Sequence, residues 1–166
     1  MSKPLKVMCV HGLGDHREKP WAKEWQATIT DVFKNHDDVE LEFAFVTYDP
    51  IFAKVKLSAW ESMQAVWKLT SSAVSTTVTG RRGIISDVSD KIKWTAGYVV
   101  AWVEDELFQQ QTRKLVLDEI AQQTPDIILA HSLGSLITYN ALSHPDAAHA
   151  AVQDALARAR FVTLGS

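Results

Sequence analysis

Residues 126–136 read Asp-Ile-Ile-Leu-Ala-His-Ser-Leu-Gly-Ser-Leu, and this stretch decides the fold. A short apolar run ends at Ala130, and a helical pattern begins directly after Ser132. This order predicts a buried strand, a sharp turn and a helix. We therefore expect one hydroxyl, that of Ser132, to lie at the apex of the turn.

The residues around the serine are the types that such a turn requires. When the serine backbone is strained in this way, the residues two before and two after it come very close to the neighbouring strand and helix. Those positions must be small, and here they are Ala130 and Gly134, in an A-x-S-x-G pattern. The Leu133 N–H would then point to where an oxyanion forms, near the positive end of the following helix. The alternative is an ordinary strand-to-helix turn in which Ser132 caps the helix.

This pattern resembles the nucleophile elbow of the α/β-hydrolase superfamily, in particular its serine esterases and lipases. A second motif, His11-Gly12-Leu13, follows an expected strand over residues 5–10. In that superfamily an H-G-x motif after an early strand supplies an oxyanion-hole N–H. The resemblance implies that Leu13 N–H is the second donor beside Leu133 N–H. His11 and Gly12 would support this loop, while His131 and Gly134 would support the elbow, with His131 pointing away from the hydroxyl.

Other interpretations of the loop after residue 10 stay open. It could be a plain turn between a strand and a helix. It could also begin a dinucleotide-binding loop, since Gly12-Leu13-Gly14 fits G-x-G, but the third glycine of that fingerprint falls at Arg17. A metal site on His11 and His16 is disfavoured because no acidic or histidine partner stands nearby at helical spacing.

Strands and helices are expected to alternate along the chain. We expect strands over residues 5–10, 39–46, 126–131 and 161–164, and helices over residues 20–33, 87–106, 112–123, 133–143 and 147–160. In the helix after Ser132, the inward residues are expected to be Leu136, Ile137, Asn140 and Ala141. In the first helix, the expected apolar face is Trp21, Trp25, Ile29, Val32 and Phe33.

This alternation predicts an α/β fold: a mostly parallel sheet with helices on both faces, in a single domain over residues 1–166. Sites in such sheets form at the carboxyl ends of the strands, where both motifs and the final Leu164-Gly165-Ser166 would lie. Residues 51–84 are expected to be either a lid over that edge or a plain packed helix and loop.

Composition excludes several classes of protein. The chain has 166 residues, 46% of them hydrophobic and 22% charged, which is ordinary for one globular domain. A net charge of −3 indicates neither a nucleic-acid surface nor a polybasic membrane patch. No apolar run is long enough to span a bilayer, and residues 1–4 lack a secretory pattern. Cys9 is the only cysteine, expected as a buried strand thiol, and a cytoplasmic location is favoured.

The catalytic triad is the point of departure from the superfamily. There the order is serine, then an acid, then a histidine, and both partners follow later strands. The candidates after Ser132 are His144, Asp146, His149 and Asp154, which we expect beside helices on a sheet face. We therefore expect the chain to be the N-terminal part of a longer hydrolase, with the acid and the base beyond Ser166. Its last strand would then be an open sheet edge that is prone to association. Residues 1–166 alone are expected to be nearly inactive.

The function that this pattern favours is hydrolysis of carboxylic esters through an acyl-enzyme at Ser132. A small-molecule or lipid ester is the expected substrate, and no metal or organic cofactor is needed. Two alternatives are a non-catalytic α/β-hydrolase-like binding module and, more weakly, a nucleotide-binding α/β domain, although the chain has no G-K-[ST] phosphate loop.

Overall fold

Four parallel strands organise the part of the chain that the structure describes. The structure is a computed structural model that describes residues 3–12, 21–36, 38–52, 99 and 101–164. The sheet order is β2-β1-β3-β4. The strands are β1 (Leu5–Val10), β2 (Leu41–Val46), β3 (Ile127–His131) and β4 (Arg160–Leu164). The expected α/β fold with a parallel sheet is thus confirmed.

The register brings the carboxyl ends of all four strands together. Val10 lies opposite Val46 on one side and opposite Ala130 on the other, and Ala130 lies opposite Thr163. The segments that leave β1 and β3, which carry the two motifs, therefore start next to each other. This edge of the sheet is the place where a parallel α/β fold forms sites.

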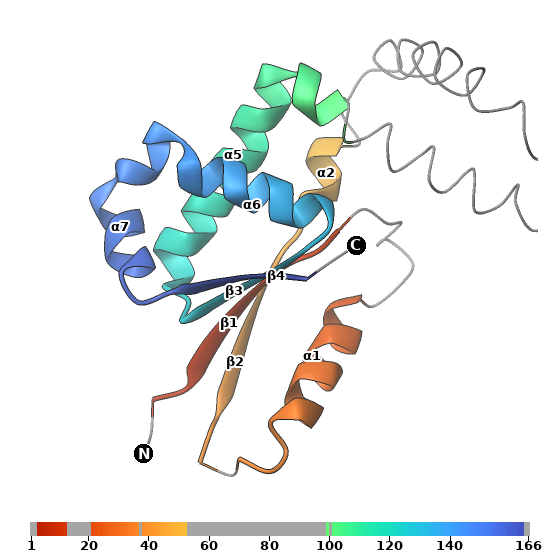
Figure 1. Ribbon diagram of the computed structural model, residues 1–166, viewed down its shortest axis with the longest axis vertical. Helices are drawn as coiled ribbons and strands as arrows, with labels where there is room; N and C mark the ends of the chain where they lie inside the picture. The colour runs from red at the N-terminus through yellow and green to blue at the C-terminus, as the bar shows by residue number, and fades with distance from the viewer. Residues whose placement is uncertain (1–2, 13–20, 37, 53–98, 100, 165–166) are drawn as a thin grey trace, which may run out of the picture.

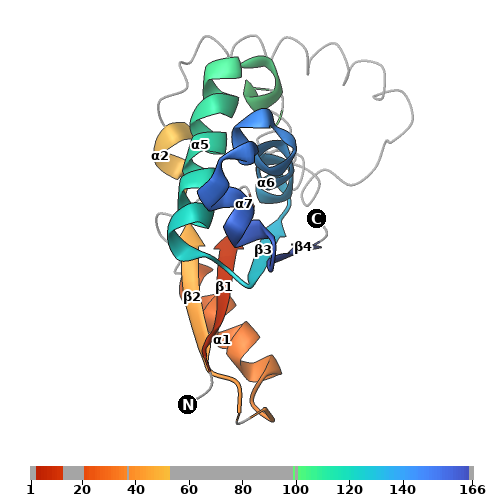
Figure 2. The same ribbon diagram turned by 90° about the vertical axis from the view of Figure 1, so that its left-hand side faces the viewer.

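Helices cover both faces of the sheet, as expected (Figures 1 and 2). Of the helices in the described residues, α1 (Trp21–Val32) lies on one face. The other face carries the remaining labelled helices: α2 (Asp49–Phe52), α5 (Glu106–Gln123), α6 (Leu133–Ser143) and α7 (Ala150–Leu156), with the short 3-10 helix η1 (Pro145–Ala148) between α6 and α7. No helix among the described residues is both long and apolar enough to cross a membrane.

The two hydrophobic clusters follow the alternation of side chains along β1. Met8 and Val10 belong to the large cluster beneath α5 and α6, whereas Val7 and Cys9 face α1 and Trp21. Cys9 is fully buried, and burial raises the pKa of its thiol to about 12. The expectation of a buried strand thiol is confirmed.

Two expected apolar faces need correction. Leu136 is 47% exposed, not inward, because α6 buries the stripe of Leu133, Ile137 and Ala141 at four-residue steps. Thr138, beside that stripe, is buried instead. In α1, Val32 is 69% exposed because it lies off the stripe of Trp21, Trp25 and Ile29, which packs against the sheet at four-residue steps.

Three expected helix boundaries are also wrong. The helix expected from Thr112 begins at Glu106, because Asp105 caps it by accepting a hydrogen bond from Phe108 N–H at 3.0 Å. The helix expected over residues 147–160 is split into η1 and α7 at the extended residue His149. Arg160 belongs to β4, where it pairs with Ile127. In the helix expected over residues 87–106, residues 99 and 101–104 are helical, Asp105 is the cap of α5 and Glu106 begins α5. The other residues of that range lie outside the described part of the chain.

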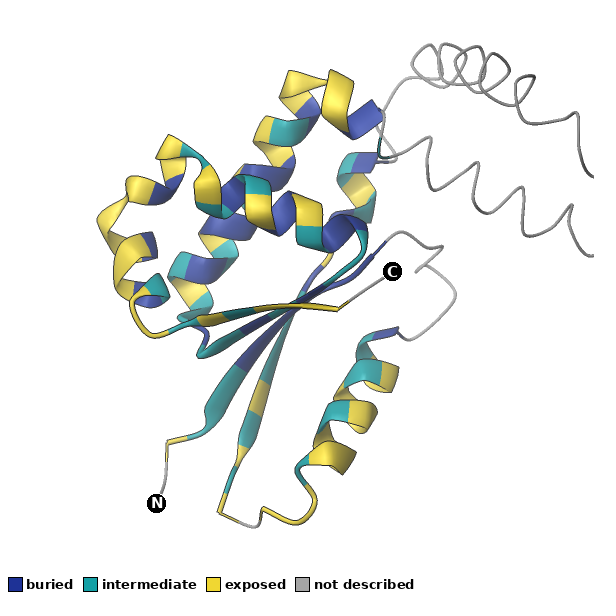
Figure 3. Cartoon of the chain, in the orientation of Figure 1, coloured by how far each residue is buried: buried dark blue, intermediate teal, exposed yellow. Residues whose placement is uncertain are grey.

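One strand at the sheet edge is largely uncovered. Figure 3 shows β4 exposed along most of its length, and Val162 and Leu164 are 41% and 39% exposed. Of the segment expected as a lid, residues 51 and 52 end α2, and residues 53–84 lie outside the described residues.

Candidate active site

The backbone of Ser132 is in a conformation that serine rarely adopts. Ser132 stands between β3 and α6 with φ 51° and ψ −124°. Among the described residues other than glycine, Thr124 also has a positive φ, but Thr124 is an ordinary left-handed cap at the end of α5. A serine outside the common regions costs of order 1–3 kcal/mol and persists only where the surroundings enforce it. The sharp bend expected at residue 132 is therefore present.

Ser132 does not behave as an ordinary capping residue. A capping serine has an extended backbone, and its side-chain oxygen accepts a hydrogen bond from the first turn of the helix. Ser132 has neither feature: its φ is positive, and its side chain makes no capping hydrogen bond. The capping interpretation of Ser132 is wrong, and the hydroxyl is not used to begin the helix.

The small residues around the bend let α6 approach the end of β1. A Cβ on Gly134 would clash with the carbonyl oxygen of His11 and come within 2.7 Å of that of Val10. Ala130 is fully buried, and its carbonyl accepts a hydrogen bond from Ser135 Oγ at 3.1 Å. The close packing that predicted a small residue at position 134 is thus observed, and Ala130 is buried as well.

The loop after β1 touches the bend directly. A Cβ on Gly12 would lie 2.9 Å from Ser132 Cβ and 2.6 Å from His131 Nδ1. Gly12 is therefore the residue that allows the first motif to contact the nucleophile candidate. Leu13, expected as an oxyanion donor, lies outside the described residues. Leu133 N–H belongs to the first turn of α6, where backbone N–H groups have no acceptor within the helix.

His11 is buried beneath the loop and tied to it. Its Nδ1 lies 2.6 Å from the carbonyl oxygen of Gly12, and its ring stacks on Tyr48 at a centroid distance of 4.3 Å. Tyr48 O–H donates to the carbonyl oxygen of His11 at 2.6 Å. His11 Nε2 lies 3.6 Å from Asp49 Oδ2. These contacts fit the supporting role expected for His11.

Tyr48 and Asp49 belong to this site, although the motifs did not indicate them. The sequence predicted only a strand over residues 39–46 shortly before them. The signal that could have found them is their position, shortly after the end of a strand at the carboxyl edge of the sheet. Burial, together with the neighbouring Asp49 carboxylate, raises the pKa of Tyr48 well above its usual range, so its hydroxyl keeps the proton that it donates.

His131 lies beside Ser132 on the α1 side of the sheet. Its ring packs edge-on against Trp25 with a centroid distance of 6.3 Å. Side chains alternate along a strand, and Ala130 belongs to the cluster on the opposite face. Packing of His131 against α1 is consistent with the supporting role expected for it.

The acidic and histidine residues after Ser132 lie far from it. His144 and Asp146 follow the end of α6, which is 11 residues long and so spans roughly 16 Å. Asp146 instead accepts a hydrogen bond from the buried Arg113 at 2.9 Å, and His149 and Asp154 are exposed at α7. The expectation that none of the four lies at the elbow agrees with this placement.

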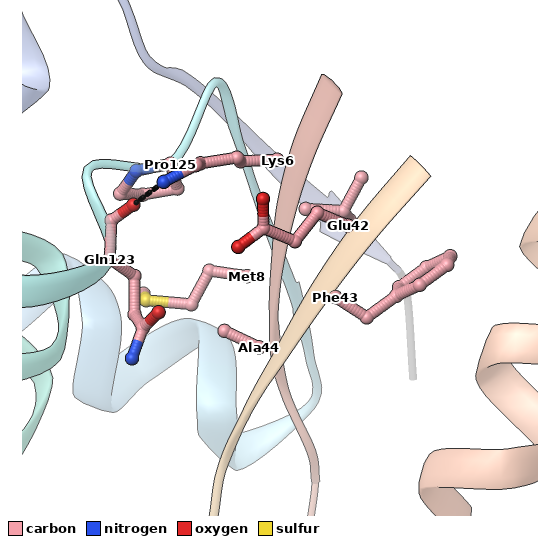
Figure 4. Close-up of a pocket in the computed structure, with 8 residues that line it drawn as sticks. Lys6, Met8, Glu42, Phe43, Ala44, Gln123 and Pro125 are labelled. Atoms are coloured by element: carbon pink, nitrogen blue, oxygen red, sulfur yellow. Dashed lines mark hydrogen bonds between the residues drawn. The ribbon is translucent and has the colours of Figure 1, made fainter. Parts of the chain in front are cut away.

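No metal-ligand cluster competes with this edge in the described part of the chain. The described residues include no cluster of three or more metal-ligand side chains. A small hollow lies at the opposite, amino end of the strands (Figure 4). There the Lys6 ammonium donates to the Gln123 carbonyl at 3.2 Å, and the walls are Lys6, Val7, Met8, Glu42, Phe43, Ala44, Gln123 and Pro125.

Comparisons with models of known families, with curated proteins and with solved structures found no match to this chain. The parallel α/β sheet and the strained serine at its carboxyl edge are therefore the observations on which a function can be argued.

Proposed function

We propose that this chain carries the nucleophile and oxyanion hole of a serine hydrolase that acts on carboxylic esters, in the manner of the α/β-hydrolase superfamily. The observation that carries the proposal is the backbone of Ser132, at φ 51° and ψ −124° between β3 and α6, with no capping bond from its side chain. A fold that holds a serine in this conformation gains no stability from its hydroxyl. Exposing a nucleophile is a use that accounts for the cost.

The chemistry assigned to the site is acyl transfer. Ser132 Oγ attacks the ester carbonyl carbon, and the carbonyl oxygen takes the electron pair of the broken π bond. The N–H groups of Leu133 and Leu13 would donate to that oxyanion. One such donor is worth roughly 10²–10³ in kcat. The intermediate then collapses to an acyl-serine and releases the alcohol, and water completes the cycle. This reaction needs no metal or organic cofactor.

The proton of Ser132 needs a base, and the histidines after Ser132 among the described residues are too remote to take it. In the α/β-hydrolases the acid and the histidine follow later strands. We propose that the acid and the base of this site likewise lie outside the described residues. Loss of a triad member in serine proteases costs about 10⁴- to 10⁶-fold in kcat. A protein from which either partner is removed should therefore show only residual esterase activity.

The test is covalent labelling of the full-length protein with a fluorophosphonate probe. Wild-type protein should be labelled, and Ser132→Ala should not. Ser135→Ala is the matched control, because Ser135 lies one turn further along α6 and its hydroxyl only bonds the Ala130 carbonyl. Labelling that persists in Ser132→Ala, or a wild-type protein that never labels, would refute the proposal. The second of these results would favour a binding module that has the same fold without the chemistry.

A further inference from the structure

One hydroxyl from beyond the end of β2 bonds the peptide against which the bend at Ser132 packs. Tyr48 lies two residues after β2 (Leu41–Val46) and is fully buried. Its O–H donates to the carbonyl oxygen of His11 at 2.6 Å. Neither sequence motif includes Tyr48, and no step of acyl transfer at Ser132 uses it.

The peptide between His11 and Gly12 contacts the bend at two points. The His11 carbonyl lies so close to Gly134, in the first turn of α6, that a Cβ there would clash with it. A Cβ on Gly12, at the other end of this peptide, would come within 2.9 Å of Ser132 Cβ. The peptide thus packs against the residues directly before and after Leu133, so its position and the conformation of the bend depend on each other.

The core holds the Tyr48 ring in place. The ring stacks on that of His11 at a centroid distance of 4.3 Å, and it packs against Phe52 at 5.1 Å. Phe52 in turn meets Phe108 of α5 edge-on at 4.2 Å. Tyr48, Phe52 and Phe108 all belong to the large hydrophobic cluster. The phenol cannot shift without disturbing this packing, so its hydrogen bond restrains the His11 carbonyl.

The direction of one oxyanion donor depends on the bend. The Leu133 N–H belongs to the planar peptide that follows Ser132, so the ψ of Ser132, −124°, determines where this N–H points. A backbone conformation that serine rarely adopts persists only where the surroundings enforce it. The peptide between His11 and Gly12 is part of those surroundings, because it contacts the bend on both sides of Leu133.

We infer that Tyr48 is a positioning residue for the bend at Ser132, on which its hydroxyl acts through the His11 carbonyl. This inference rests on the proposed function, because that function gives the bend its catalytic purpose. Tyr48 is fully buried and so does not touch the substrate. By holding the carbonyl against α6, it keeps the Leu133 N–H aimed before charge develops on the ester oxygen.

The test compares Tyr48→Phe with Thr112→Val in the full-length protein. Tyr48→Phe keeps the ring and removes the hydroxyl. Thr112→Val is the matched control because it also removes a fully buried hydroxyl, whose hydrogen-bond partners are Trp102 Nε1 at 3.0 Å and carbonyls of α5. Both variants should melt at a lower temperature than wild type, since each loses a buried hydrogen bond.

The two variants should differ in catalysis. In Tyr48→Phe we expect kcat for a short p-nitrophenyl ester to fall about 10- to 100-fold, because a misaimed donor costs less than the roughly 10²–10³ of a deleted one. KM should stay within about twofold, because ground-state binding does not depend on the oxyanion donors. Thr112→Val should keep both constants within about twofold of wild type, because its hydroxyl does not contact the loop or the bend.

Affinity for an oxyanion analogue separates positioning from a merely structural role. A trifluoromethyl ketone forms an adduct with the serine that places an oxyanion at the same point as the ester. Its affinity should fall in Tyr48→Phe in parallel with kcat/KM and stay unchanged in Thr112→Val. The inference is overturned by an unchanged kcat in Tyr48→Phe, by a loss of kcat without a loss of ketone affinity, by equal losses in the two variants, or by a Tyr48→Phe protein that does not fold.

A stability measurement tests the same link without activity. In the wild-type background, Ser132→Gly should unfold at a higher urea concentration than Ser132→Ala, because glycine relieves the strain at the bend. Without the Tyr48 hydroxyl the bend can relax, so this advantage of glycine should shrink by about half or more in Tyr48→Phe. It should persist in Thr112→Val. An advantage that is absent in the wild-type background, or of equal size in Tyr48→Phe, contradicts the inference.

The inference and the proposed function fail in different ways. Ester hydrolysis or labelling that survives Ser132→Ala removes the proposed function, and the inference with it. An inactive Ser132→Ala protein beside a fully active Tyr48→Phe protein removes the inference alone.

Discussion

Replacing Ser132 by glycine should make the protein more stable than replacing it by alanine. Both variants lack the hydroxyl, and neither loses a capping bond because the Ser132 side chain makes none. Alanine keeps a Cβ at φ 51°, where the strain is of order 1–3 kcal/mol. Glycine removes most of that strain but adds about 0.5–1 kcal/mol of unfolded-state entropy. The difference in the free energy of unfolding should be about 0.5–2 kcal/mol in favour of glycine.

The assay is urea unfolding followed by circular dichroism, with thermal melting as a second probe. For a chain of this size, each kcal/mol shifts the melting temperature by about 2–4 °C. Ser135 supplies the matched pair, because it stands in α6 without a positive φ and both substitutions remove the same hydroxyl. At Ser135 the order should reverse, with alanine more stable than glycine by about 0.5–1 kcal/mol. Alanine being the more stable residue at both positions would refute a strained bend at Ser132.

Three further predictions concern packing, charge and pH. Gly134→Ala should lower the free energy of unfolding by about 1–3 kcal/mol in urea, because the new Cβ meets the His11 carbonyl; an unchanged value would contradict that packing. Asp146→Ala should cost about 1–2 kcal/mol in the same assay, because it leaves the mostly buried Arg113 without its carboxylate, and a neutral result would show that solvent replaces the pair. Burial raises the Cys9 pKa from 9.0 to about 12, so the folded state keeps a proton that the unfolded chain releases above pH 9. The Cys9 contribution to stability is therefore present below pH 9 and lost as pH rises towards 12, so urea midpoints at pH 8 and pH 10 should differ more in wild type than in Cys9→Ala.

Much of the sheet could be predicted from residues 126–136 and 5–12, because both stretches carry local requirements. When a buried strand is followed by small residues and a helical pattern, the chain can pair its backbone N–H and C=O groups in only a few ways. The observed bend at Ser132 and the packing of Gly12 and Gly134 follow from that. The errors arose where local pattern was ambiguous. Leu136 was expected inward from its hydrophobicity, but the direction of α6 is set by Gly134 against β1, which turns Leu136 to solvent.

Tyr48 and Asp49 could not be found from local pattern, for a different reason. Their role depends on β2 pairing in parallel with β1, so that Val46 lies opposite Val10 and the two strand ends meet. That pairing joins residues 36 positions apart and has no signature within either stretch. The sequence also predicted an oxyanion donor at Leu13, which lies outside the described residues.

The most direct test of the account is an experimental structure of the full-length protein after phosphonylation. The account predicts phosphorus bonded to Ser132 Oγ, a positive φ at Ser132, and the phosphoryl oxygen about 2.7–3.1 Å from the backbone nitrogens of Leu13 and Leu133. An adduct on another residue would contradict the account. So would a Ser132 with an extended backbone whose hydroxyl accepts a hydrogen bond from the first turn of α6.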